Sequence, residues 1–160
     1  MKNDIKYMKL ALEKALLSVD PSTQNGAVIV NEETGEILGS GCNEFPKGVE
    51  ISDERWERPL KYNFVEHAER NSIFDCVKNG KATKGMTMYC PWFACSDCAR
   101  AIIQSGVLRV VGHKVDVTSD RWGSSIEVAL QMLKEAGVQM DYVDHYYGIT
   151  VRRNGELLEF

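Results

Sequence analysis

Segments with the pattern of a strand and segments with the pattern of a helix alternate along most of the chain. Apolar residues recur every three or four positions from Ile5 to Val19, which predicts an amphipathic helix that Pro21 ends. Further helices are predicted over about 67–78, 95–104 and 124–136, and strands over 26–31, 35–42, 85–90, 107–113 and 137–143. This alternation predicts an α/β fold in which helices cover both faces of a sheet.

The 160 residues have the length of one ordinary domain, and a hydrophobic fraction of 44% is enough to build a core. We therefore expect a single domain over 1–160. Residues 46–66 are charged and rich in turn formers, which predicts a long loop. The tail from 148 to 160 carries Asn154-Gly155 between apolar-rich runs, which indicates a hairpin or an edge extension.

The charge and apolar patterns exclude some classes of protein. A net charge of −4 and a pI near 5.4 disfavour binding to long nucleic acid. No apolar window approaches the roughly 18 residues that span a bilayer, and the first residues lack the apolar run of a signal peptide. We expect a cytoplasmic protein without a membrane partner. The chain has five cysteines, and in that reducing compartment the clustered ones are expected to bind metal or to react rather than to form disulfides.

Three of these cysteines lie in the segment CPWFACSDCAR, residues 90–100. Cys95 and Cys98 stand three positions apart at a predicted helix start, so about 60° separates them around the helix axis and both face one ion. Unpaired backbone N–H groups and the positive end of the helix dipole stabilise thiolates at such a position. His67, which also opens a predicted helix, is the candidate for a third ligand.

Three ligands leave one position of a tetrahedral zinc ion open, as in catalytic sites. Water would fill it, and two thiolates would acidify that water less than an all-histidine site, where its pKa falls to about 7. A carboxylate is then needed to accept the proton. Glu69 is expected to border the same cavity at the helix tip, and general acid–base catalysis typically contributes about 10² to 10⁴ in rate.

Two alternatives without this chemistry use Cys90. In the first, Cys90 is the fourth ligand of a closed, structural zinc site in a binding module. In the second, Cys90, Cys95 and Cys98 have the C-x4-C-x2-C spacing of plant-type iron–sulfur proteins. The iron–sulfur alternative needs a further downstream cysteine, and none follows Cys98.

The motifs HAERN, at 67–71, and ACSDCARAIIQSG, at 94–106, resemble those of the zinc-dependent cytidine and deoxycytidylate deaminase superfamily. DPSTQNGAVIVN, GEILGSGCNEFPKG and MTMYC occur in the order of the deoxycytidylate branch, so the resemblance covers roughly 20–111. It implies a three-layer α/β/α fold with a five-stranded mixed sheet. It also implies zinc bound by His67, Cys95 and Cys98, with Glu69 as the acid and base.

The same resemblance implies hydrolytic removal of ammonia from C4 of cytosine, with dCMP as substrate and dUMP as a product for thymidylate synthesis. Asn43 would contact the sugar or base, and the backbone of Ala68 would hold the polar edge of the pyrimidine. The resemblance further implies a homo-oligomer with dCTP and dTTP as effectors. A free nucleoside, a 5-modified dCMP and a tRNA base remain alternative substrates.

A 5′-phosphate on the substrate would need a cationic partner. The candidates are basic residues of two loops: Lys47, Arg55, Arg58, Lys61 and Arg121. Trp92, close to the zinc motif, is placed to pack against a base. Glu44 stands where the family usually has glycine, and its carboxylate would repel a phosphate unless it points away or contacts a modified base.

Overall fold

The central sheet of the protein is mixed. The structure is a computed structural model that describes residues 2–114, 117–118 and 121–160. Within these ranges, five strands pair in the order β2-β1-β3-β4-β5. They are β1 (Gly26–Asn31), β2 (Glu36–Cys42), β3 (Thr87–Tyr89), β4 (Arg109–Gly112) and β5 (Gln139–Tyr142). β1 is antiparallel to β2 and β3, whereas β3, β4 and β5 are parallel. The predicted α/β class and five-stranded mixed sheet are confirmed.

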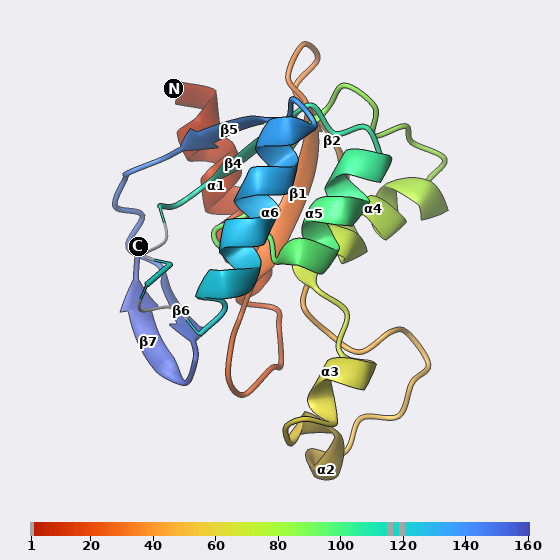
Figure 1. The fold of residues 1–160 in the computed structure, drawn as a ribbon, viewed down its shortest axis with the longest axis vertical. Helices are drawn as coiled ribbons and strands as arrows, with labels where there is room; N and C mark the ends of the chain where they lie inside the picture. The colour runs from red at the N-terminus through yellow and green to blue at the C-terminus, as the bar shows by residue number, and fades with distance from the viewer. Residues whose placement is uncertain (1, 115–116, 119–120) are drawn as a thin grey trace.

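Helices cover both faces of this sheet (Figure 1). Helix α1 (Lys2–Ala15) lies on one face, and α4 (Ala68–Lys78), α5 (Ser96–Gln104) and α6 (Gly123–Glu135) lie on the other. The alternation of side chains along a strand explains the division. In β1, Val28 and Val30 pack in the cluster that includes α1, while Ile29 packs in the cluster that includes the other helices.

Helix α1 ends at Ala15, before the end of its apolar pattern. The reason is a polar turn that follows it. The Ser18 hydroxyl donates to the carbonyl of Asn43 at 2.7 Å and accepts from the backbone N–H of Asp20 at 3.3 Å. Val19, which the pattern places on the apolar side, is 65% exposed. Tertiary hydrogen bonds at the turn thus override the local periodicity.

Helix α4 lies very close to β2 because two residues of that strand are glycines. A Cβ atom at Gly39 would stand 2.6 Å from the carbonyl oxygen of Ser72, and one at Gly41 would stand 2.7 Å from the backbone nitrogen of the same residue. Real Cβ atoms do not approach so closely. The two glycines therefore fix how α4, and with it His67, sits on the sheet.

The segment 46–66, predicted as a loop, contains two one-turn helices, α2 (Asp53–Trp56) and α3 (Lys61–Phe64). They project from the body of the protein, at the bottom of Figure 1. Phe45 stacks on Trp56 with ring centroids 4.5 Å apart and also contacts Phe64 at 5.9 Å. A single helical turn is too short to show a period of 3.6 residues, so the pattern does not reveal it.

The C-terminal segment forms the predicted hairpin, with β6 (Thr150–Arg153) and β7 (Glu156–Glu159) paired in a separate two-stranded sheet. Asn154 and Gly155 make its turn, with φ of 52° and 90°, values that Asn and Gly tolerate best. None of the helices in the described ranges has the length and apolar character needed to cross a membrane.

We expect Gly39→Ala to lower the free energy of unfolding by about 1–3 kcal/mol, because the added methyl group overpacks the contact between β2 and α4. Ser40→Ala is the matched control, since it alters the neighbouring residue of the strand without adding an atom. Urea unfolding of both variants checks the prediction. Equal unfolding free energies for Gly39→Ala and the unaltered protein would contradict it.

Candidate active site

Two helix N-termini meet at the three predicted metal ligands. His67 is the N-cap of α4, Cys95 is the N-cap of α5, and Cys98 lies in the first turn of α5. Nδ1 of His67 is 3.5 Å from Sγ of Cys95 and 3.4 Å from Sγ of Cys98. Among the residues that the structure describes, these three form the one cluster of His, Cys, Asp or Glu donors that could hold a metal ion, with donor atoms within 4.8 Å of one another.

The geometry of this cluster fits zinc. Zinc–sulfur bonds of about 2.3 Å and a zinc–nitrogen bond of about 2.0–2.1 Å at tetrahedral angles would separate nitrogen from sulfur by about 3.5 Å. Both nitrogen–sulfur distances agree with this value. The hydrogen bond from Cys98, together with His67, lowers the pKa of Cys95 to about 4, which favours the thiolate form of this sulfur. Three donors leave a fourth tetrahedral position for another ligand.

Cys90 lies in a different environment. Its thiol donates to the carbonyl of Trp92 at 3.0 Å, and its sulfur is 3.4 Å from the side-chain nitrogen of Asn25. Burial raises the pKa of this thiol well above its ordinary value, so it stays protonated. Within the described ranges, Cys90 is not a member of the donor cluster. The arrangement therefore disfavours a closed four-ligand site and an iron–sulfur site.

Glu69 faces the same pocket as the metal ligands. It is the second residue of α4, only 3% exposed, and it lines the pocket together with His67 and Cys95. Residues two apart on a regular helix point in different directions, but His67 has extended backbone with φ of −80° and ψ of 152°. Both side chains therefore reach one cavity. Burial raises the pKa of the Glu69 carboxyl, which favours proton uptake at this position.

Asn25 contacts this carboxylate from β1's side of the pocket. Its side-chain N–H donates to Oε2 of Glu69 at 3.5 Å. Asn25 is 9% exposed, so its amide is shielded from bulk water. Asn25 thus places a neutral hydrogen-bond donor beside the carboxylate without adding a charge.

The pocket brings together some of the predicted substrate contacts and leaves others outside. Asn43, Ala68, Trp92, Arg58 and Lys61 line it. Lys47, Arg55 and Arg121 lie outside the lining that the described residues form. Arg55 instead covers the ring of Phe64 at 4.5 Å, and the Arg121 guanidinium bonds to the hydroxyl of Tyr62.

Asn43 and Lys61 are largely engaged within the protein. The Asn43 amide donates to Oδ2 of Asp20 at 2.9 Å and to the carbonyl of Thr23 at 2.7 Å, and its oxygen accepts from the backbone N–H of Asn25 at 2.7 Å. Nζ of Lys61 pairs with Oδ1 of Asp20 at 2.7 Å in a buried ion pair. These bonds set the shape of loop 20–25 beside the pocket. They leave Asn43 one oxygen lone pair for a ligand.

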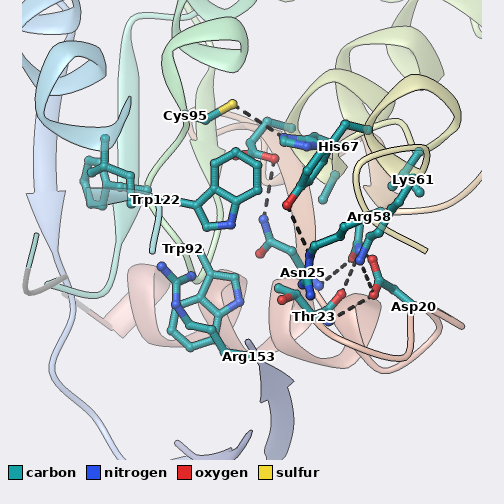
Figure 2. A pocket seen from close by; sticks show the side chains of 17 residues that line it. Asp20, Thr23, Asn25, Arg58, Lys61, His67, Trp92, Cys95, Trp122 and Arg153 are labelled. Atoms are coloured by element: carbon teal, nitrogen blue, oxygen red, sulfur yellow. Dashed lines mark hydrogen bonds and ion pairs between the residues drawn. The ribbon is translucent and has the colours of Figure 1, made fainter. Parts of the chain in front are cut away.

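Arg58 differs from Lys61 in its partners. Its guanidinium bonds to the hydroxyls of Ser22, at 2.5 Å, and of Tyr62, at 3.1 Å. Both partners are neutral, and none of the described carboxylates forms an ion pair with it. The positive charge of Arg58 is therefore not balanced by any described carboxylate. Arg58 lies at the exposed mouth of the pocket, where Figure 2 places it close to Thr23.

Glu44 points away from the pocket. It is exposed, and it lines a separate hollow with Lys14, Asn71 and Lys78. Its backbone pairs with that of Glu66 at the end of the segment containing α2 and α3. The electrostatic objection to a phosphate in the pocket therefore does not apply to this residue.

Sequence reasoning missed several residues that line the pocket: Asp20, Thr23, Trp122 and Arg153. The Trp122 ring stands edge-on to His67, with centroids 5.9 Å apart. Arg153 comes from the C-terminal hairpin. The pattern predicted that hairpin, but no local signal indicates which part of the molecule a hairpin packs against.

Comparisons with known proteins agree with this geometry. Residues 1–114 match the family model of the cytidine and deoxycytidylate deaminase zinc-binding region. The chain belongs to this deaminase family. The deoxycytidylate deaminase of Mus musculus is 39% identical over 140 residues, which cover 82% of this chain and 74% of that protein. An uncharacterised deaminase of Aliivibrio fischeri is 36% identical over 141 residues, which cover 86% of this chain and 91% of that protein.

A solved deaminase has the same fold. The dCMP deaminase of cyanophage S-TIM5, in complex with dCMP and dUMP, superposes with a TM-score of 0.71 at 28% identity, covering 89% of this chain and 99% of that chain. Zinc is therefore the metal that the family membership and the donor cluster both support.

We expect Cys98→Ala to lose bound zinc, whereas Cys90→Ala keeps about one zinc ion per chain, because Sγ of Cys90 bonds to a backbone carbonyl instead. Mass spectrometry of the metal content in the purified variants measures both. Loss of zinc in Cys90→Ala would instead support a closed structural site.

Proposed function

We propose that the protein is a zinc-dependent hydrolase that converts dCMP and water into dUMP and ammonia, and so supplies dUMP for thymidylate synthesis. One observation carries this proposal: the donor cluster of His67, Cys95 and Cys98 opens onto the pocket that the buried carboxylate of Glu69 also lines. The mouse relative and the S-TIM5 enzyme, which bear the name of this activity, support the choice of substrate. The proposal takes residues 1–160 as one deaminase domain.

Glu69 carries the proton transfers in this proposal. Bound zinc would lower the pKa of a water molecule at its open position. Glu69 would accept one proton from the attacking water and pass it to N3 of the ring. It would then accept the second proton, from the hydroxyl now bonded to C4, and give it to the amine, which leaves as ammonia. The raised pKa of the carboxyl suits a group that must both take up and release a proton. Asn25, on Oε2, holds the carboxylate in one orientation through the cycle.

The start of α4 offers groups for the pyrimidine. The first N–H groups of a helix have no partner within it, and Ala68 is the first residue of α4. Its backbone would hold the polar edge of the base. The remaining lone pair of Asn43 would accept from the sugar, and the ring of Trp92 would pack against the ligand from the opposite wall.

The mouth of the pocket favours a nucleotide over a nucleoside. Arg58 brings a positive charge that none of the described carboxylates neutralises, and guanidinium groups suit phosphate oxygens. Lys61 is paired with Asp20, so we assign it a structural role in the pocket wall and not a phosphate contact. A free nucleoside, a 5-modified dCMP and a tRNA base are the alternative substrates, and the acidic balance of the chain disfavours the tRNA.

We also propose a cytoplasmic location, which the five free thiols support because a reducing compartment preserves them. A homo-oligomer and regulation by dCTP and dTTP are proposed on the family resemblance of the segments between 20 and 111. These are separate from the reaction itself.

We expect Glu69→Gln to lower kcat for dCMP by at least about 10² to 10⁴, while zinc binding stays intact, because the amide cannot accept the proton. Ammonia release and metal content, measured on one preparation, check both statements. Unchanged turnover in this variant would falsify the proposed mechanism.

We expect dCMP to be deaminated with a higher kcat/KM than the nucleosides cytidine and deoxycytidine. The reason is the cationic mouth of the pocket, which a nucleoside leaves unused. Ammonia release from each compound in parallel measures the order. A higher kcat/KM for deoxycytidine than for dCMP would contradict the phosphate assignment.

A further inference from the structure

We propose that the C-terminal hairpin, residues 148–160, completes the substrate pocket and that Arg153 binds the 5′-phosphate of the nucleotide. The hairpin lies beyond residues 1–114, which match the family model. The inference extends the proposed function, on which it rests for the nature of the substrate. It assigns a binding role to a segment outside the zinc motif.

Arg153 is held at the wall of the pocket. Its side chain is mostly buried, at 8% exposure, although it carries a charge. Its guanidinium lies over the ring of Trp92 at 4.1 Å from the centroid, and Figure 2 shows the two side chains stacked at one side of the pocket. Trp92 is itself fixed, because its Nε1–H donates to the carbonyl of Gln24 at 3.2 Å. The stacking leaves the guanidinium little freedom, so little entropy is lost when it binds a ligand.

Backbone hydrogen bonds anchor the hairpin to loop 20–25. The backbone N–H of Gly155 donates to the carbonyl of Ser22 at 2.8 Å, and the N–H of Gln24 donates to the carbonyl of Arg152 at 2.7 Å. The N–H of Asn154 donates to Oγ1 of Thr23 at 3.0 Å. Thr23 lines the pocket, so the strand that carries Arg153 is attached directly to the pocket wall.

The same loop joins Arg153 to the other cation of the pocket mouth. Arg58 bonds to Oγ of Ser22, whose carbonyl accepts from the hairpin. The two guanidinium groups therefore border one pocket and are linked through one short loop, while the charge of Asp20 in that loop is paired with Lys61. The charge of Arg58, which none of the described carboxylates neutralises, favours an anionic ligand at this pocket, and Arg153 lies in the same lining. A phosphate is the anionic part of the proposed substrate.

The neighbouring arginine provides a matched control. Arg152 precedes Arg153 on β6, and successive side chains of a strand point to opposite faces. Arg152 is not among the described residues that line the pocket. Its hydrogen bonds to Gln24 use the backbone, which a side-chain substitution leaves in place.

The test compares Arg153→Gln, Arg153→Lys and Arg152→Gln with the unaltered protein on dCMP and on deoxycytidine. We expect Arg153→Gln to raise KM for dCMP by about 10- to 100-fold, the usual effect of losing charged hydrogen bonds, and to leave kcat/KM for deoxycytidine within about twofold. Arg153→Lys should raise KM for dCMP less, because it keeps the charge but loses the planar fork. Arg152→Gln should change neither KM for dCMP nor kcat/KM for deoxycytidine.

Two outcomes would overturn the assignment. An unchanged KM for dCMP in Arg153→Gln would show that Arg153 does not bind the phosphate. An equal loss of kcat/KM for dCMP and for deoxycytidine would show that the residue only supports the fold. Zinc content and urea unfolding show whether the variants keep their structure, and Arg153→Lys carries the test if Arg153→Gln does not fold.

A binding measurement separates this proposal from the proposed reaction. If the unaltered protein deaminates no cytosine compound, the proposed function fails, and calorimetric titration with dUMP tests Arg153 directly. Weaker dUMP binding in Arg153→Gln than in Arg152→Gln would support the assignment of Arg153 to the phosphate. Equal binding in both, or no binding to the unaltered protein, would overturn it.

Discussion

The meeting of two helix N-termini at His67, Cys95 and Cys98 is the contact that organises the molecule. Each N-terminus presents unpaired N–H groups and the positive end of a dipole, so two of them side by side favour anionic groups between them. The lowered pKa of Cys95 agrees with this preference for an anion, and the nitrogen–sulfur distances match those of a tetrahedral zinc site. The sheet holds α4 and α5 at the required separation, and Gly39 and Gly41 let α4 lie close enough to do so.

The second organising feature is the buried carboxylate of Asp20. It accepts from Lys61 and from Asn43, and its oxygen also caps the turn at Ser22 and Thr23. A carboxylate with this many donors is well compensated for its burial. One wall of the pocket thus draws on α3, on the residue after β2, and on the loop before β1. The C-terminal hairpin then adds a further layer to this wall through Ser22 and Thr23.

The sequence patterns predicted the elements whose signals are local. The helices, the five strands of the sheet and the Asn154-Gly155 turn each follow from periodicity or turn chemistry. The one-turn helices α2 and α3 were not predicted, because four residues are too few to show a helical period. The end of α1 at Ala15 was also missed, since a hydrogen bond from Ser18 to Asn43, the residue after β2, holds the turn that follows the helix.

The candidate site divides in the same way. His67, Glu69, Cys95 and Cys98 were predictable because the chemistry of zinc and of proton transfer demands particular residue types at helix starts. The sorting of the basic residues was not predictable: Arg58 stays at the pocket mouth, Lys61 is neutralised by Asp20, and Arg55 covers a phenylalanine. By itself the sequence determined the α/β class, the candidate zinc ligands and the family. Only the tertiary structure decided which charged side chains line the pocket and that Arg153 is one of them, because ion pairing and stacking depend on contacts between segments far apart in the chain.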